Sequence, residues 1–387
     1  MTSLNLPTAN RTQTILNLST PKNHVIRPES YNRTVYAAAH VVADPLADID
    51  PWLEPAIDWD KTIEFREQLW SRGLGVAEAM DTAQRGMGLN WELSLELIKR
   101  SIAARNARGG GLIACGAGTD HLTPSPDVTI DDVIAAYEMQ CEAVEAAGGR
   151  VILMASRALV ACAKSPDDYK KVYRHILSQL KQPAILHWLG EMFDPALQGY
   201  WGADNHDTAM DTAVDIVTDN AAKIDGIKIS LLSAEKEIKM RRRLPESVLM
   251  YTGDDFNYPD LIEGDEQGYS HALLGIFDAI APAAAAALTA LGEGRIDDYH
   301  NIFKPTVPLS RHIFKAPTRF YKTGIVFLAY LNGFQDHFTM ISGQQSTRSA
   351  LHLAELIRLA DTAGALINPD LAASRAKSVF LTYGIEV

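Results

Sequence analysis

The chain has 387 residues, a hydrophobic fraction of 47%, a formal net charge of −12 and a pI near 5.4. This length fits one large α/β barrel with extensions or about two to three smaller domains. The acidic balance argues against nucleic-acid binding and against a polybasic membrane-surface role. Cys115, Cys141 and Cys162 lack CxxC or metal-ligand spacing, which indicates a reduced, cytoplasmic protein. We find no apolar stretch suited to a signal core or a bilayer span.

Residues 1–30 are rich in Asn, Thr and Ser and predict an N-terminal arm or edge hairpin. From Val35 onward, apolar runs of strand length alternate with segments of helical periodicity. The predicted strands cover residues 35–42, 75–80, 111–115, 151–155, 184–189, 224–232, 248–252 and 269–274. The predicted helices cover residues 59–71, 91–106, 129–147, a segment that opens at 165, 207–223 and 233–243.

Strands and helices that alternate in this way predict a (β/α)8 TIM barrel. After Ile276 the sequence predicts helices alone, over residues 281–291, 296–303, 318–333 and 347–362. We therefore expect an N-terminal arm over 1–30, a barrel over 31–280 and a C-terminal helical extension over 281–387.

Lys228 is the most informative residue for chemistry. It lies in the apolar run 224–232, where alternation puts Gly226, Lys228 and Ser230 on one face and apolar residues on the other. Burial lowers the pKa of a lysine and makes its amine nucleophilic, which suits Schiff-base chemistry. The alternative is a lysine at the strand end that reaches solvent or pairs with a carboxylate.

Polar residues follow the predicted strands at the carboxyl ends, where a barrel enzyme places its site. Taken singly, each is more often a loop cap or a solvated charge. For Asp254 and Asp255 we expect a structural or supporting role rather than a catalytic one, in which the carboxylates accept hydrogen bonds from the local backbone. The alternative is that they bind a metal or the substrate. The full set is His40, Asp44, 81–86, 116–121, Ser156, Arg157, His187, Trp188, Glu191, Lys228, Ser230, 252–255, Ser270 and His271.

Two motifs carry a family resemblance, the strand Gly226-Ile227-Lys228-Ile229-Ser230 and the turn Gly253-Asp254-Asp255. Weaker matches are Gly264 to Gly268, Ala279 to Pro282 and Lys322 to Gly333. Together they resemble the dihydrodipicolinate synthase / N-acetylneuraminate lyase family of class I aldolases, of which this chain looks like a divergent member. The resemblance implies a TIM barrel, a Schiff base on Lys228 and a homodimer or homotetramer.

The chain departs from this family in two places. The family's Gly-Thr-Thr-Gly-Glu loop, which holds the carboxylate of a keto acid, is replaced by Met80 to Gly86. In that loop Thr82 keeps a hydroxyl, but Asp81 adds a negative charge, which argues against pyruvate. The family's proton-relaying tyrosine on strand five aligns with His187, and histidine can relay a proton near neutral pH.

The sequence therefore predicts a lyase or aldolase that cleaves or forms a C–C bond in a small oxo-acid or sugar-derived ketone. Lys228 would form the imine and His187 would shuttle the proton. This chemistry needs no cofactor and no metal. The expected substrate-binding residues are Asp81, Thr82, Gln84, Arg85, Asp120, His121, Arg157 and Ser230.

Two other functions stay open. A metal-dependent barrel hydrolase or divalent-metal aldolase would draw its ligands from imidazole and carboxylate groups near the strand ends. No HxH or HExxH pair is present, so this alternative rests on position alone. The third is a non-catalytic ligand-binding barrel, against which an enclosed Lys228 argues. The residues considered for the metal are His40, His121, His187, Glu191 and His271.

Overall fold

The computed structural model describes residues 2–387 and contains a closed barrel of parallel strands. The strands follow one another around the barrel in chain order, and the last pairs with the first through Ala272 and Val35. This is the (β/α)8 TIM barrel that the sequence predicts. Its strands are β3 (Val35–Ala38), β4 (Gly75–Glu78), β5 (Ile113–Ala117), β6 (Arg150–Leu153), β7 (Ala184–Leu189), β8 (Ile224–Ser230), β9 (Leu249–Thr252) and β10 (His271–Leu274).

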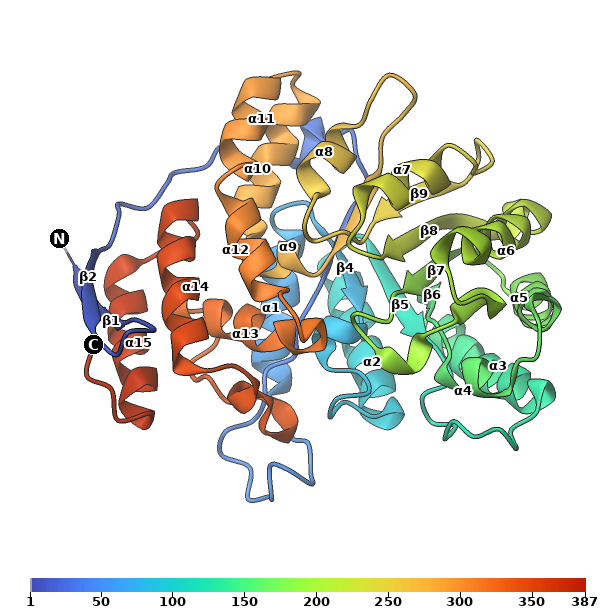
Figure 1. Cartoon of the computed structure of the whole chain (residues 1–387), viewed down its shortest axis with the longest axis horizontal. Coiled ribbons are helices and arrows are strands. Elements are labelled where there is room, and N and C mark those ends of the chain that lie inside the picture. Colours follow the sequence, from blue (N-terminus) through green and yellow to red (C-terminus); the bar gives the residue numbers. More distant parts are fainter. Residues whose placement is uncertain (1) are drawn as a thin grey trace.

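Helices connect the strands and cover the outside of the barrel (Figure 1). Local capping explains where several of them start: the Thr129 side chain accepts from the Asp132 backbone N–H, and Pro166 occupies the first turn of another helix. The connecting helices are α1 (Trp59–Trp70), α2 (Trp91–Ala107), α3 (Ile130–Ala146), α4 (Arg157–Cys162), α5 (Pro166–Gln179), α6 (His206–Asp219), α7 (Ala234–Arg241) and α8 (Tyr258–Glu263).

The barrel interior and the layer between strands and helices form separate apolar clusters. Ile227 and Ile229 of β8 belong to the layer beneath the helices, so Lys228 between them points to the inside. Gly226 occupies the same inner face, where a Cβ atom would lie 2.6 Å from the Tyr251 ring. The alternation predicted for this strand is therefore present.

The C-terminal extension is entirely helical and packs beside the barrel (Figure 1). Three of its helices were not predicted, namely α9 (Ile276–Ala279), α12 (Thr306–Ile313) and α15 (Pro369–Thr382). The helix α12 contains Pro308, which obscures the helical pattern. Within the extension, α13 is buried along its whole length. The helices are α9 (Ile276–Ala279), α10 (Ala281–Gly292), α11 (Ile296–Phe303), α12 (Thr306–Ile313), α13 (Tyr321–Leu331), α14 (Ala350–Ala363) and α15 (Pro369–Thr382).

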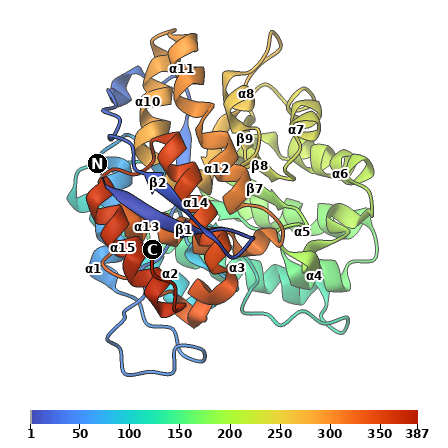
Figure 2. The ribbon, with the colours of Figure 1, turned by 60° about the vertical axis from the view of Figure 1, so that its left-hand side comes forward.

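The N-terminal arm forms an antiparallel hairpin of β1 (Ser3–Pro7) and β2 (Gln13–Asn17). Figure 2 shows this hairpin lying across the C-terminal helices rather than on the barrel. Leu4 and Leu6 are buried there, and the Arg358 guanidinium on α14 donates to the carbonyl oxygen of Leu6 at 3.1 Å. No helix within residues 2–387 is long and apolar enough to cross a membrane.

Candidate active site

Lys228 lies in the middle of β8, is 7% exposed, and opens onto a small cavity at the carboxyl end of the barrel. It forms no ion pair with any carboxylate of residues 2–387. Burial lowers the pKa of its amine, and the charges of Asp255 and Asp81 oppose this shift. The polar residues that line the cavity are Asp81, Thr82, Lys228, Ser230, Asp255 and Tyr321.

The turn after β9 shapes one wall of this cavity. A Cβ atom at Gly253 would lie 2.8 Å from Lys228 Cε, so glycine leaves room for the lysine side chain. Asp254 accepts from the backbone N–H groups of Phe256 and Asn257, which is the structural role expected for it. Asp255 accepts from the Ile276 N–H at 2.8 Å, and burial raises the pKa of its carboxyl group.

Thr82 and Tyr321 meet at the cavity from opposite parts of the chain. Thr82 lies in a short 3-10 segment (Asp81–Ala83) after β4, and Tyr321 is the first residue of α13. Thr82 Oγ1 and the Tyr321 hydroxyl are 2.8 Å apart. Burial raises the pKa of Tyr321 well above its usual value, so the phenol keeps its proton near neutral pH. No local sequence pattern marks Tyr321 as a site residue, although it adjoins the Lys322 motif.

His187 lies on β7 beside Lys228 but does not line the cavity. Its Nε2 atom is 3.2 Å from Ser230 Oγ, and its Nδ1 atom is buried without a hydrogen-bond partner in residues 2–387. Burial and the charge of Lys228 lower the pKa of His187 well below its usual value. The imidazole is therefore neutral, and its hydrogen bond to Ser230, which lines the cavity, connects it to that space.

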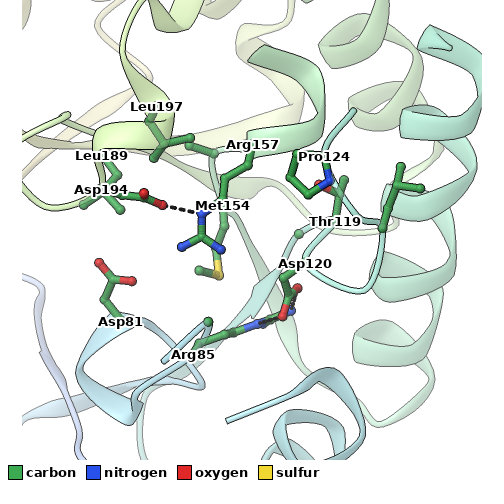
Figure 3. Close-up of a pocket in the computed structure, with 14 residues that line it drawn as sticks. Asp81, Arg85, Thr119, Asp120, Pro124, Met154, Arg157, Leu189, Asp194 and Leu197 are labelled. Atoms are coloured by element: carbon green, nitrogen blue, oxygen red, sulfur yellow. Dashed lines mark hydrogen bonds and ion pairs between the residues drawn. The ribbon is translucent and has the colours of Figure 1, made fainter. Parts of the chain in front are cut away.

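A second pocket adjoins the cavity, formed by loops after β4, β5, β6 and β7 (Figure 3). Asp81 and Leu189 line both spaces. Arg85 is already occupied: Nη2 pairs with Asp120 Oδ1 at 2.7 Å and Nη1 donates to the Gly116 carbonyl at 2.6 Å. Although burial favours its neutral form, the charge of Arg85 lowers the pKa of Asp120 to about 2. These two residues brace the pocket wall.

Arg157 and Asp81 keep unused hydrogen-bonding capacity in this pocket. The Arg157 Nε atom pairs with Asp194 Oδ2 at 2.5 Å, but its terminal Nη atoms have no partner among residues 2–387. The Asp81 carboxylate likewise accepts no hydrogen bond from these residues. Figure 3 shows the guanidinium of Arg157 directed toward the space beside Asp81. The Gly86 backbone approaches closely, since a Cβ there would lie 2.9 Å from Arg157 Nη1.

Gln84 and His121, two other expected substrate-binding residues, lie outside the lysine cavity. The Gln84 side chain donates to the Ile341 carbonyl oxygen at 2.9 Å and holds a loop. His121 lies 2.8 Å from the Gln140 side-chain nitrogen, in a shallow outer depression. A second buried lysine, Lys322, donates from Nζ to the Arg319 carbonyl at 3.1 Å. Burial lowers its pKa, and the charge of Asp81 opposes this shift.

The residues considered for a metal site do not come together. No group of three or more His, Cys, Asp or Glu within residues 2–387 could hold a metal ion. His40 pairs with Asp278 at 2.7 Å, and Glu191 pairs with His206 at 3.0 Å. The placement of Ser270 and His271 at a carboxyl strand end is wrong, because β10 begins at His271 and these residues lie at the opposite end of the barrel.

The fold matches solved structures of dihydrodipicolinate synthases. The enzyme from Oceanobacillus iheyensis has 17% identity and a TM-score of 0.60, over 86% of this chain and 97% of that one. A prophage protein of E. coli K12 from the dihydrodipicolinic acid synthase family, in complex with pyruvate, has 13% identity and a TM-score of 0.65, over 86% and 98%. The Acinetobacter baumannii synthase, complexed with pyruvate, has 16% identity and a TM-score of 0.62, over 86% and 99%.

At these identities the likeness establishes the fold: a (β/α)8 barrel of the dihydrodipicolinate synthase type with a C-terminal helical extension. The chain belongs to the family described as "Protein of unknown function (DUF993)", whose model matches residues 4–385. No curated protein matches the sequence.

Proposed function

We propose that this protein is a Schiff-base lyase or aldolase that cleaves or forms a C–C bond in a small carbonyl compound. The observation that carries the proposal is the environment of Lys228: a buried amine without an ion-pair partner in residues 2–387, open to a cavity at the carboxyl mouth of the barrel. A lysine so placed has little structural purpose, and its lowered pKa favours the neutral, nucleophilic amine. The shared fold with dihydrodipicolinate synthases supports the same reading.

In this proposal Lys228 Nζ attacks the carbonyl carbon and forms a carbinolamine. The carbinolamine oxygen takes up a proton and leaves as water, while the nitrogen lone pair forms the C=N bond. The resulting iminium accepts the electron pair of a neighbouring C–C bond when that bond breaks. The reverse sequence forms a C–C bond, and both directions need a group that gives and takes protons beside the lysine.

We assign this proton transfer to Tyr321, whose hydroxyl lies on the cavity wall and bonds Thr82. Its phenol keeps the proton until the leaving oxygen needs it, and Thr82 can pass a replacement proton through the hydrogen bond. His187, the proton shuttle expected from sequence, would exchange protons with the cavity indirectly, through its hydrogen bond to Ser230. Asp255 would steady the charge that forms on Lys228 as the iminium appears.

Borohydride trapping tests the proposal. The purified protein is incubated with a panel of keto acids and hydroxyketones, reduced, and weighed by mass spectrometry. We expect one compound or more to add its reduced mass to the native chain and to Lys322→Ala, but not to Lys228→Ala. Lys322 is the matched control because it is also a buried lysine near Asp81. Labelling of Lys228→Ala to the same extent as the native chain would contradict the proposal.

A further inference from the structure

Asp81 is the charged group that the lysine cavity and the outer pocket have in common. Its carboxylate accepts no hydrogen bond from residues 2–387, although it is partly enclosed. Because no group of these residues uses its acceptor atoms, a ligand in either space can donate hydrogen bonds to them. Asp81 therefore points to a substrate that carries hydroxyl or amino hydrogens near its carbonyl group.

The same carboxylate disfavours one class of carbonyl compound. In an α-keto acid, the carboxylate is attached directly to the carbonyl carbon that Lys228 would attack. This added carboxylate would enter a small cavity that the Asp81 carboxylate already lines. Like charges at close range in a weakly solvated site repel strongly. A hydroxymethyl group in the same place would instead donate a hydrogen bond to Asp81.

The outer pocket supplies the opposite charge at the other end of the substrate. Arg157 has its Nε atom on Asp194, and its terminal Nη atoms remain free to bind an anion in two-point geometry. The neighbouring wall is apolar, with Leu122, Met154 and Leu197. Figure 3 shows the Arg157 guanidinium and the Asp81 carboxylate on either side of a common space. A ligand that extends from Lys228 past Asp81 would meet Arg157.

We propose that Asp81 and Arg157 select a hydroxylated ketone that bears a hydroxyl group next to its carbonyl and an anionic group, carboxylate or phosphate, at its far end. This inference rests on the proposed imine chemistry at Lys228 and narrows its substrate class. The covalent step is the same: Nζ replaces the carbonyl oxygen, which leaves as water, and borohydride reduces the imine to a stable amine.

Five probes separate the contributions in a trapping assay on the full chain. Dihydroxyacetone phosphate has both features, dihydroxyacetone lacks the anion, and pyruvate is an α-keto acid. The pair 5-hydroxy-4-oxopentanoate and 4-oxopentanoate tests a distal carboxylate with and without the hydroxyl. We expect the native protein to trap the hydroxylated anionic compounds about tenfold or more faster than dihydroxyacetone or pyruvate. Comparison of the trapping rates of dihydroxyacetone phosphate and 5-hydroxy-4-oxopentanoate shows whether the site prefers a phosphate or a carboxylate.

Two variants assign this preference to their residues. Asp81→Asn should raise the trapping rate of pyruvate about tenfold and lower that of the hydroxyketones, because the repulsion and the acceptor are both weakened. Arg157→Gln should remove the advantage of dihydroxyacetone phosphate over dihydroxyacetone. Asp127→Asn, at an exposed carboxylate, is the matched control and should leave all rates unchanged. Thermal melting of each variant checks the fold.

The outcomes that overturn the inference are distinct from those that overturn the proposed function. If the native protein traps pyruvate on Lys228 as fast as the hydroxyketones, and Asp81→Asn changes neither rate, the inference is wrong while the Schiff-base function stands. If none of the five compounds is trapped on Lys228 in a folded protein, the inference and the proposed function both fall.

Discussion

The hydroxyl groups of Thr82 and Tyr321 lie 2.8 Å apart although 239 residues separate them in the chain. Thr82 follows the second barrel strand, and Tyr321 opens a buried helix of the C-terminal extension. The extension therefore does more than cover the barrel: it supplies a phenol to the cavity that holds Lys228. A barrel truncated before this helix would lack part of its candidate active site.

Tyr321→Phe should lower turnover by about 10²- to 10⁴-fold, the usual contribution of a positioned proton donor. Thr82→Val should lower it less, because the phenol stays in place. Tyr258→Phe is a matched control, since Tyr258 is a buried tyrosine bonded to Thr306 that does not line the cavity. The rate of imine formation with a trapped compound is the measurement. Near-normal rates for Tyr321→Phe, with a pH profile like the native one, would shift the role to His187.

Glu78→Gln should destabilise the fold by about 3–5 kcal/mol, because it breaks a fully buried ion pair. Glu78 Oε1 lies 2.8 Å from Arg66 Nη2 and also accepts from the Ala79 backbone N–H. Urea unfolding gives the free-energy difference. Glu96→Gln, which breaks the exposed pair with Arg100, should change stability by less than about 1 kcal/mol. A similar, small cost for both variants would show that the buried pair is not needed.

His352 should make the protein less stable in mild acid. Burial and the neighbouring His312 lower the pKa of His352 to about 3, whereas the unfolded chain binds the proton near 6.5. The unfolded state therefore gains the proton first, so the contribution of His352 is complete above pH 6.5 and is lost as pH falls toward 3. The rings of His352 and His312 stack at 4.1 Å, which His352→Phe would preserve.

The difference in Tm between pH 7 and pH 4.5 should accordingly be smaller for His352→Phe than for the native chain. His175→Phe, at an exposed histidine that pairs with Glu138, is the comparison and should change this difference in Tm less than His352→Phe does. An unchanged pH dependence in His352→Phe would mean that other groups cause the acid sensitivity.

Deleting the arm, Thr2 to Ser30, should leave a folded barrel with a lower Tm. Barrel closure is made by β3 and β10, which the arm does not join, but removal of the hairpin exposes apolar surface on α14. Circular dichroism and size-exclusion chromatography test this expectation. An insoluble or molten product would show that the hairpin, through Leu4 and Leu6, belongs to the core.

Local pattern was enough to predict the barrel and the inward face of β8, because apolar alternation and strand length are properties of short segments. The start of β10 was misplaced by two residues, since Tyr269 and Ser270 precede the apolar residues of the strand without joining the ladder. Residue type also suggested Arg85 as a free substrate ligand, whereas its partners Asp120 and Gly116 lie on another strand and its loop.

The site itself was only partly predictable, because several of its contacts join residues that are far apart in the chain. The apolar strand around Lys228 predicts its inward position from sequence alone. Tyr321 reaches the cavity through the packing of α13 against the barrel, and no local sequence pattern predicts that contact. Likewise, the sequence placed His187 near Lys228 correctly, since their strands are neighbours, but could not show that Ser230 stands between the imidazole and the cavity.

The most direct test of the account is peptide mapping after borohydride reduction with a trapped hydroxyketone. We expect the added mass on the peptide that spans Ile224 to Leu232, with none on the peptide that contains Lys322. Lys228→Ala and Lys228→Arg should both lose the label, because neither a methyl group nor a guanidinium can form the imine. Both variants should keep the native Tm. A label on Lys322, or full labelling of folded Lys228→Ala, would contradict the account.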